Sequence, residues 1–284
     1  MNIDIDHLKL WEGLSESHEQ VAVAAPAQAL AAVLDRDDRE PGAGSELPPG
    51  WHWLYFLPMH RQSEIGVDGH PRRGGFLPPV PLPRRMWAGS RIDFLQPLRI
   101  GGRMTKTSRI ESVSLKDGRS GPLVFVRVRH ELAGPKGMAV IEDQDIVYRD
   151  HPAPGEPIPG PRIASEAPDW VREIHPDEVL LFRFSALTFN GHRIHYDRRY
   201  AVEVEGYPGL VVHGPLTATL LLDLLRCEKP NSRVTHFSFR AVKPLFDTAP
   251  FQLCGRCNAA DQSVSLWARD AFGHVAMEAI AKLA

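Results

Sequence analysis

Residues 214–227 read GPLTATLLLDLLRC, an apolar run that opens with glycine and proline. Proline is favoured in the first turn of a helix, and Lys229-Pro230-Asn231 stops the run, so the stretch predicts a long helix. The run is too short to cross a membrane, and it contains Thr217, Thr219 and Asp223. A sheet that wraps around such a helix buries both, which predicts an α+β fold.

Apolar segments with strand-like alternation lie on both sides of this helix in the sequence. They predict eight strands, at 90–99, 102–116, 122–133, 138–149, 232–243, 250–258, 262–270 and 274–283. Three further elements are expected, namely a helix over 17–34 with a break near Pro26, a strand over 51–58 and a strand over 178–189. The proline- and glycine-rich stretch 58–89 is too apolar for a linker, and we expect an ordered segment that covers another part of the surface.

The two parts of the chain resemble each other. Ile92–Leu98 (IDFLQPL) has the same pattern as Phe239–Leu245 (FRAVKPL). Val128–Glu142 and Leu266–Glu278 both contain a strand, a glycine turn and a strand that ends in glutamate. The repeated patterns indicate an internal duplication, and chance similarity between strand patterns is the alternative.

Six prolines in residues 151–168 mark a boundary between the two copies. We therefore expect an N-terminal half at 1–150, a proline-rich linker at 151–168 and a C-terminal half at 169–284. Each half is large enough to bury a core of its own.

The composition excludes several classes of protein. Of 284 residues, 43% are hydrophobic and 24% are charged, and the net charge is -2, so neither disorder nor nucleic-acid binding is indicated. The N-terminus lacks a signal pattern, and three cysteines suit a reducing compartment, so we expect a cytoplasmic protein without membrane contact. Cys254 and Cys257 form a Cys-x-x-Cys on a predicted strand, where they point to opposite faces and are expected to pack.

Groups that can transfer protons concentrate in residues 188–197, which read TFNGHRIHYD. Loops beside strands commonly carry catalytic groups. Gly214 begins the long helix, where unpaired N–H groups and the helix dipole favour developing negative charge. A histidine-bearing loop with such a donor is what enolate chemistry of a thioester requires. The loop's candidates are Asn190, His192, His195 and Asp197, with Arg193, Arg198 and Arg199 beside them.

This loop resembles the MaoC-like hydratase/dehydratase motif, Gly-Asp-x-Asn-Pro-Ile-His-x-Asp. Residues 209–225 (GLVVHGPLTATLLLDLL) resemble the start of that family's central helix. Residues 74–89 (GGFLPPVPLPRRMWAG) and the N-terminal half are similar to a narrower group, which includes hydratases of itaconyl-CoA and 3-methylfumaryl-CoA and the mitochondrial-type hydroxyacyl-thioester dehydratases. The resemblance covers nearly the whole chain. It implies a hydro-lyase with a double hotdog fold, in which two fused halves each wrap an antiparallel sheet around a long helix.

The motif also implies roles for individual residues. Asn190 stands at the family's catalytic aspartate, His195 at its catalytic histidine, His192 at its asparagine and Arg193 at its proline, while Asp197 matches directly. An amide cannot exchange a proton, so His195 is expected to be the principal acid and base and Asn190 to position the water.

Other residues are expected to complete the site. The N–H of Gly214 would polarise the thioester oxygen, with His192, Asp197 and His213 as possible support. The candidates for binding CoA phosphates or a substrate carboxylate are Arg84, Arg85, Arg193, Arg198 and Arg199, with a solvated basic face as the alternative and His70 as a weaker candidate. The spacing of the loop histidines departs from common zinc patterns, so no metal is expected.

The sequence thus predicts a hydratase of a short unsaturated dicarboxylyl-CoA, such as itaconyl-CoA or 3-methylfumaryl-CoA, which would give citramalyl-CoA as in itaconate degradation. A (3R)-hydroxyacyl-thioester dehydratase, a hotdog thioesterase and a non-catalytic acyl-thioester binding protein are the alternatives. No cofactor is expected, because CoA is part of the substrate. The acyl-CoA is the expected partner, with a homodimer possible.

Overall fold

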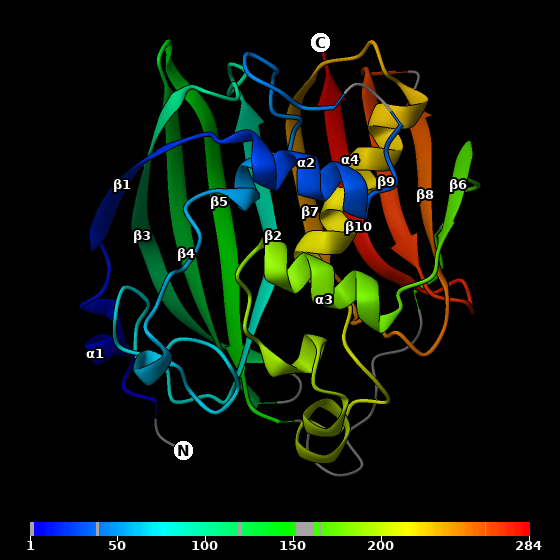
Figure 1. Ribbon diagram of the computed structural model, residues 1–284. Coiled ribbons are helices and arrows are strands. Elements are labelled where there is room, and N and C mark those ends of the chain that lie inside the picture. Colours follow the sequence, from blue (N-terminus) through cyan, green and yellow to red (C-terminus); the bar gives the residue numbers. More distant parts are fainter. Residues whose placement is uncertain (1–2, 38–39, 119–120, 152–161, 165, 259) are drawn as a thin grey trace.

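The computed structural model describes residues 3–37, 40–118, 121–151, 162–164, 166–258 and 260–284. Within this part of the chain, ten antiparallel strands form a single sheet in the order β1-β3-β4-β5-β2-β7-β10-β9-β8-β6 (Figure 1). The strands are β1 (Ser15–Val21), β2 (Arg84–Phe94), β3 (Arg103–Gly118), β4 (Gly121–Gly134), β5 (Gly137–Arg149), β6 (Trp170–Ile174), β7 (Val234–Ala241), β8 (Phe251–Asn258), β9 (Ser263–Arg269) and β10 (Val275–Leu283). All eight predicted strands are present, as β2–β5 and β7–β10, and the two edge strands were missed.

The two sets of strands meet at the antiparallel pair β2–β7. Arg91 faces Ser238 in this pair, and these are the residues immediately before the repeated segments Ile92–Leu98 and Phe239–Leu245. Equivalent positions of the two copies therefore pair with each other, as an internal duplication about a two-fold axis requires. The predicted linker, 151–168, lies mostly outside the described residues, so the domain boundaries stay a prediction.

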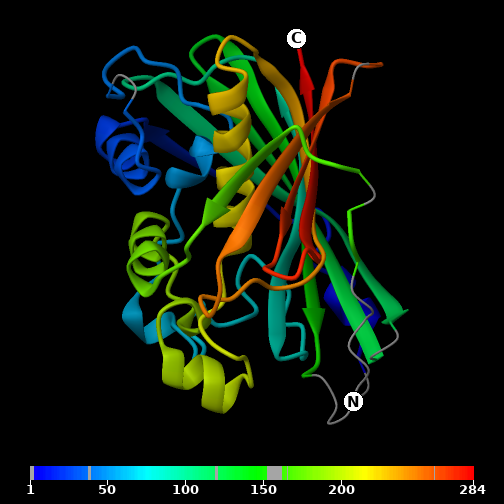
Figure 2. The same cartoon turned by 90° about the vertical axis from the view of Figure 1, so that its right-hand side faces the viewer.

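Three helices cover one face of the sheet, as Figure 2 shows: α2 (Ala24–Val33), α3 (Glu178–Leu187) and α4 (Gly214–Glu228). Every residue of α4 from Leu216 to Leu225 is buried, because sheet and neighbouring helices surround it. No helix of the described residues is long and apolar enough to cross a membrane. The shorter helical elements are α1 (Ile5–Lys9), the 3₁₀ turns Trp51–Leu54, Gln62–Glu64 and Arg193–His195, and the π-helix Tyr200–Val204.

The helix predicted over 17–34 is wrong in its first part. Ser15–Val21 pairs antiparallel with β3 as an edge strand, and α2 begins only at Ala24. Pro26 therefore lies in the first turn of a helix, where its missing N–H costs no hydrogen bond, and it causes no break.

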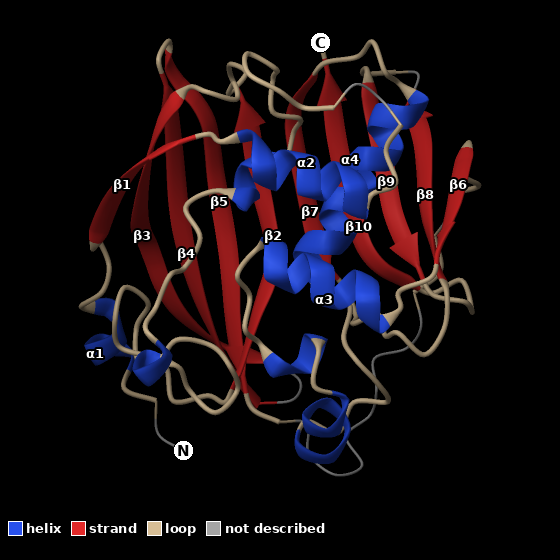
Figure 3. Cartoon of the chain, in the orientation of Figure 1, coloured by secondary structure: helices blue, strands red, loops and turns tan. Residues whose placement is uncertain are grey.

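Two predicted strands are helical instead. The segment 178–189 is mostly helix α3 (Figure 3), because the Asp177 carboxylate accepts the N–H of Leu180 at 2.8 Å and caps the first turn. The segment 51–58 begins with a 3₁₀ turn after Gly50, whose φ of 85° turns the chain. Both segments are short apolar runs, whose periodicity alone does not separate a helix from a strand.

The Cys-x-x-Cys pair lies on β8. Cys254 is buried against Trp267 and Val275, and Cys257 is half-buried at the edge of the main core. Both are free thiols that pack among apolar residues, as predicted.

A buried carboxylate ties α4 to elements from both halves. Asp223 accepts a hydrogen bond from Arg36, which follows α2, at 2.6 Å, and another from Arg172 of β6 at 2.7 Å. Its side chain is 3% exposed, so this carboxylate is compensated by two guanidinium groups in place of water.

We expect Asp223→Ala to lower the free energy of unfolding by about 3–5 kcal/mol, because it removes the shared partner of two partly buried cations. Urea denaturation followed by tryptophan fluorescence measures this change. Asp93→Ala is the control: Asp93 is 54% exposed in its ion pair with His236, and its loss should cost less than ~1 kcal/mol. Equal losses in the two variants would contradict the anchoring role of Asp223.

Candidate active site

His195 is held in one tautomer. Its ring is buried, and Nδ1 lies 2.7 Å from the carbonyl oxygen of Val211. Because a carbonyl only accepts, Nδ1 must carry the proton, and Nε2 keeps its lone pair. The chain therefore presents an imidazole that is ready to take a proton.

His213 brings this imidazole to the start of α4. The two rings stack with centroids 3.7 Å apart at 18°, and His213 is the N-cap residue of α4. Nε2 of His213 lies 2.8 Å from the hydroxyl of Ser185, which fixes the ring from the side of α3. His195 therefore lies beside the turn in which Gly214 begins α4. The N–H of Gly214 could donate to a developing oxyanion only if it lay near the base in this way. His213 lies between Ser185 and His195, and its supporting role stays a prediction.

Burial sets the charge of these rings. Desolvation lowers the pKa of His195 to about 4, although the hydrogen bond to Val211 opposes the shift. Desolvation also places the pKa of His213 well below its ordinary value. Both imidazoles are neutral at pH 7, which is the state that a general base needs.

The other polar residues of the loop shape it. Oδ1 of Asn190 accepts a hydrogen bond from the backbone N–H of His192 at 3.0 Å. The amide Nδ2 is then the atom of this side chain that can donate a hydrogen bond to a water. The carboxylate of Asp197 accepts from Nη2 of Arg193 at 2.7 Å and from the N–H of Tyr200 at 3.0 Å. Asp197 thus fixes the loop and the π-helix that follows, and makes no hydrogen bond to His195 among the described contacts.

Four of the five candidate arginines are already bound to carboxylates of the chain. Arg84 pairs with Glu205, Arg193 with Asp197, Arg198 with Asp247 and Glu178, and Arg199 with Glu203. These contacts give the four a structural role in this conformation, which differs from the predicted role in ligand binding. Arg85 differs, because no carboxylate of the described chain lies within 4.0 Å of it.

A segment of the N-terminal half covers the catalytic loop. The carbonyl of Asp68 accepts the N–H of Arg193 at 2.9 Å, and the carbonyl of Val67 accepts from its guanidinium at 3.0 Å. Gly69, at a φ of +88°, packs against the backbone of Gly191. The expectation that stretch 58–89 covers another surface is confirmed, and that surface is the site itself.

This segment adds two groups that sequence reasoning ranked low or missed. The His70 ring lies against that of His192, with centroids 3.9 Å apart and the planes tilted by 39°, and its Nδ1 lies 3.2 Å from the carboxylate of Asp68. Burial lowers the pKa of both histidines, whereas the hydrogen bond and charge of His70 lower the pKa of Asp68 against the effect of its own burial. The Asp-x-His spacing of Asp68 and His70 in a glycine-rich turn is the sequence feature from which these two groups could have been predicted.

These three groups also have the composition of a metal site. One ligand atom each of Asp68, His70 and His192 lies within 4.8 Å of the others, and imidazole with carboxylate suits several transition metals. Arg85 lines the same cavity as Asp68 and His192, and its positive charge opposes a cation there.

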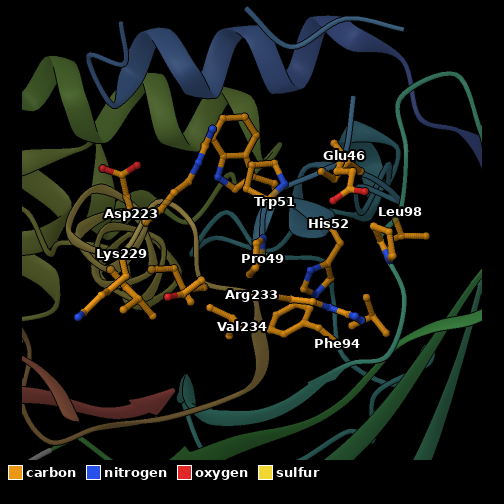
Figure 4. Close-up of a pocket in the computed structure, with 18 of the residues that line it drawn as sticks. Glu46, Pro49, Trp51, His52, Phe94, Leu98, Asp223, Lys229, Arg233 and Val234 are labelled. Carbon is orange, nitrogen blue, oxygen red and sulfur yellow. The ribbon is translucent and has the colours of Figure 1, made fainter. Parts of the chain in front are cut away.

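Two cavities lie near opposite ends of α4. A small one of about 40 Å³ at the catalytic loop is lined by Asp68, Pro83, Arg84, Arg85, Met86, His192, Ile194, Glu205 and Tyr207. A larger one of about 460 Å³ contacts the last turns of α4, and Figure 4 shows Trp51, His52 and Phe94 around it. The predicted catalytic residues His195, Asn190 and Gly214 line neither cavity, but His192 and Ile194 of their loop line the smaller one, so we place the chemistry beside it.

The fold and the loop define a double hotdog protein of the MaoC-like dehydratase class. A MaoC-like dehydratase from Phytophthora capsici superposes with a TM-score of 0.70 at 14% identity, covering 99% of both chains. A Mycobacterium tuberculosis protein described as a double hotdog superposes with a TM-score of 0.57 at 12% identity, covering 96% of both chains. These likenesses confirm the predicted fold.

The chain belongs to the hydroxyacyl-thioester dehydratase type 2 family, which it matches over residues 50–247. It is 49% identical to mesaconyl-C(4)-CoA hydratase of Chloroflexus aurantiacus over 276 residues, 96% of each chain. It is 26% identical to the mitochondrial hydroxyacyl-thioester dehydratase type 2 of Schizosaccharomyces pombe, over 74% of this chain and 78% of that protein. The protein is therefore an enzyme of the hydratase/dehydratase type, as predicted.

The contact between Gly69 and Gly191 gives a test of the covering segment. We expect Gly69→Ala to lower both kcat/KM and Tm, because a Cβ there would overlap the Gly191 carbonyl oxygen. The matched control is Gly74→Ala, which has a φ of +92° but a nearest neighbour at 3.7 Å, and so adds only backbone strain of about 1–2 kcal/mol. Equal activity and Tm in the two variants would show that the segment does not need this close contact.

The lowered pKa of His195 predicts the pH dependence of the reaction. A base must be unprotonated, so kcat/KM should stay level from pH 8 down to about 6 and fall only as the pH passes through about 4. Initial rates across this range measure the acid side of the pH–rate profile, with circular dichroism as the control for unfolding. A midpoint near 6.5, the ordinary value for histidine, would contradict the buried neutral state.

Proposed function

We propose that the protein adds water to mesaconyl-C4-CoA, also named 3-methylfumaryl-CoA, and forms citramalyl-CoA. The observation that carries the proposal is the neutral His195, held with Nε2 unprotonated beside the start of α4 in a member of a hydratase/dehydratase family. The named activity of the 49% identical relative supports the choice of substrate, and itaconyl-CoA is kept as a second C5 substrate.

The reaction with mesaconyl-C4-CoA, whose double bond is conjugated with the thioester, follows from these groups. Nε2 of His195 takes a proton from water, whose oxygen bonds to the β-carbon of the thioester. The electron pair of the double bond moves toward the thioester carbonyl, and the N–H of Gly214 stabilises the resulting enolate oxygen. The protonated His195 then returns its proton to the α-carbon, so that one water is added and the base is restored. The Nδ2 of Asn190 holds the water in position.

The reaction needs no cofactor, since CoA enters as part of the substrate. We extend the proposal to a cytoplasmic enzyme that forms a homodimer, for which the sequence and the resemblance to hotdog enzymes are the support.

Dehydration of a (3R)-hydroxyacyl thioester is the second candidate. The family description and the Schizosaccharomyces pombe relative favour it. The same groups would run this reaction in reverse, because proton transfer and oxyanion stabilisation serve both directions.

A panel of CoA thioesters tests both candidates, with absorbance at the enoyl band as the readout. We expect hydration of mesaconyl-C4-CoA and a loss of about 10²–10⁴ in rate for His195→Ala, while its circular dichroism stays unchanged. Turnover confined to long-chain hydroxyacyl thioesters would favour the second candidate. Release of free thiol, or full activity in the variant, would contradict the proposed chemistry.

A further inference from the structure

The substrates proposed above share a feature that the site must accommodate. Both mesaconyl-C4-CoA and itaconyl-C4-CoA give citramalyl-CoA, so the carbon that receives the hydroxyl also carries the free carboxylate. This carboxylate therefore lies one bond from the atom that water attacks. A buried carboxylate needs a compensating cation, and that cation must lie next to the catalytic loop.

Arg85 is in this position. It lies on β2 opposite Tyr148 of β5, and it lines the small cavity together with His192 of the catalytic loop. The ring of His192 is 5.4 Å from that of His195, centroid to centroid, in an edge-to-face arrangement. Arg85 therefore shares a cavity with the ring that lies edge-to-face against the proposed base, and its charge acts on that ring.

The carboxylates of the cavity already have partners of their own. Glu205 accepts from Arg84 at 3.2 Å and from the hydroxyl of Tyr200 at 3.3 Å. Asp68 accepts from the backbone N–H of His70 at 3.0 Å and from its ring. Neither carboxylate lies within ion-pair distance of Arg85 in the described structure. The neighbour of its guanidinium is the Tyr148 hydroxyl, whose pKa it lowers against the larger effect of burial, so Arg85 lines the cavity with its positive charge and without a carboxylate partner.

The neighbouring histidines do not supply that charge. Burial lowers the pKa of His192 and of His70, and the charge of Arg85 lowers both further, so the rings are neutral at pH 7. An arginine keeps its charge when it is partly buried and presents a planar fork that fits a carboxylate.

We infer that Arg85 binds the free carboxylate of the substrate and so selects dicarboxylyl thioesters over simple enoyl thioesters. The inference rests on the proposed hydratase function and assigns its specificity to one residue. Arg85 is a specificity residue and takes no part in proton transfer. Its removal should therefore act on the affinity for one class of substrate and leave the chemical step intact.

Steady-state kinetics of Arg85→Met with two thioesters tests this inference. For mesaconyl-C4-CoA we expect kcat/KM to fall about 100-fold, mainly through KM, as expected when one partner of a buried charge pair is removed. For crotonyl-CoA, which has no carboxylate, kcat/KM should not fall. If wild-type protein does not turn over crotonyl-CoA, its inhibition constant against mesaconyl-C4-CoA serves as the comparison and should not change.

Two further variants serve as controls. Arg85→Lys keeps the charge without the fork, so it should fall between wild type and Arg85→Met for mesaconyl-C4-CoA. Arg109→Met removes a 60% exposed arginine from β3 and should change neither substrate. Equal losses on both thioesters, or no loss on either, would overturn the inference and leave the hydratase function standing. A wild-type protein that hydrates neither thioester would overturn the proposed function, and this inference with it.

Discussion

The hydrogen bond between Nδ1 of His195 and the carbonyl of Val211 is the interaction on which the site depends. It fixes one tautomer, so that Nε2 is the atom left to accept a proton. It also joins the catalytic loop to the strand-like segment that leads into α4, and His213 continues this link by stacking on the ring. The groups proposed for proton transfer and for oxyanion binding are thereby placed side by side by a short stretch of backbone.

The site is assembled from both copies of the duplicated chain. The C-terminal half supplies the loop and α4, whereas the N-terminal half covers the loop through the turn around Gly69 and contributes Arg85 from β2. The strand β2, which carries Arg85, pairs with β7 of the C-terminal half at the centre of the sheet. If Arg85 selects the substrate as we infer, a change of sequence in the N-terminal half alters substrate choice without touching the proposed base His195.

Much of this was predictable from sequence. Alternation predicted the eight inner strands, and the apolar run 214–227 predicted α4, because both patterns repeat over enough residues to be distinctive. The segments 51–58 and 178–189 were wrongly predicted to be strands, because in a short apolar run a single cap or turn determines whether a helix or a strand forms. The loop motif named His195, but no pattern showed that Arg84 and Arg193 are bound to Glu205 and Asp197, since such pairs form only in the folded chain.

The state of His195 can be observed directly by ¹⁵N NMR of protein labelled at the imidazole nitrogens, with His195→Gln to assign its signals. We expect a protonated Nδ1 and an unprotonated Nε2 at pH 7, with no titration until the pH approaches about 4. A proton on Nε2 at pH 7, or a titration centred near 6.5, would contradict it, because His195 would then not be the neutral base on which the proposed hydration depends.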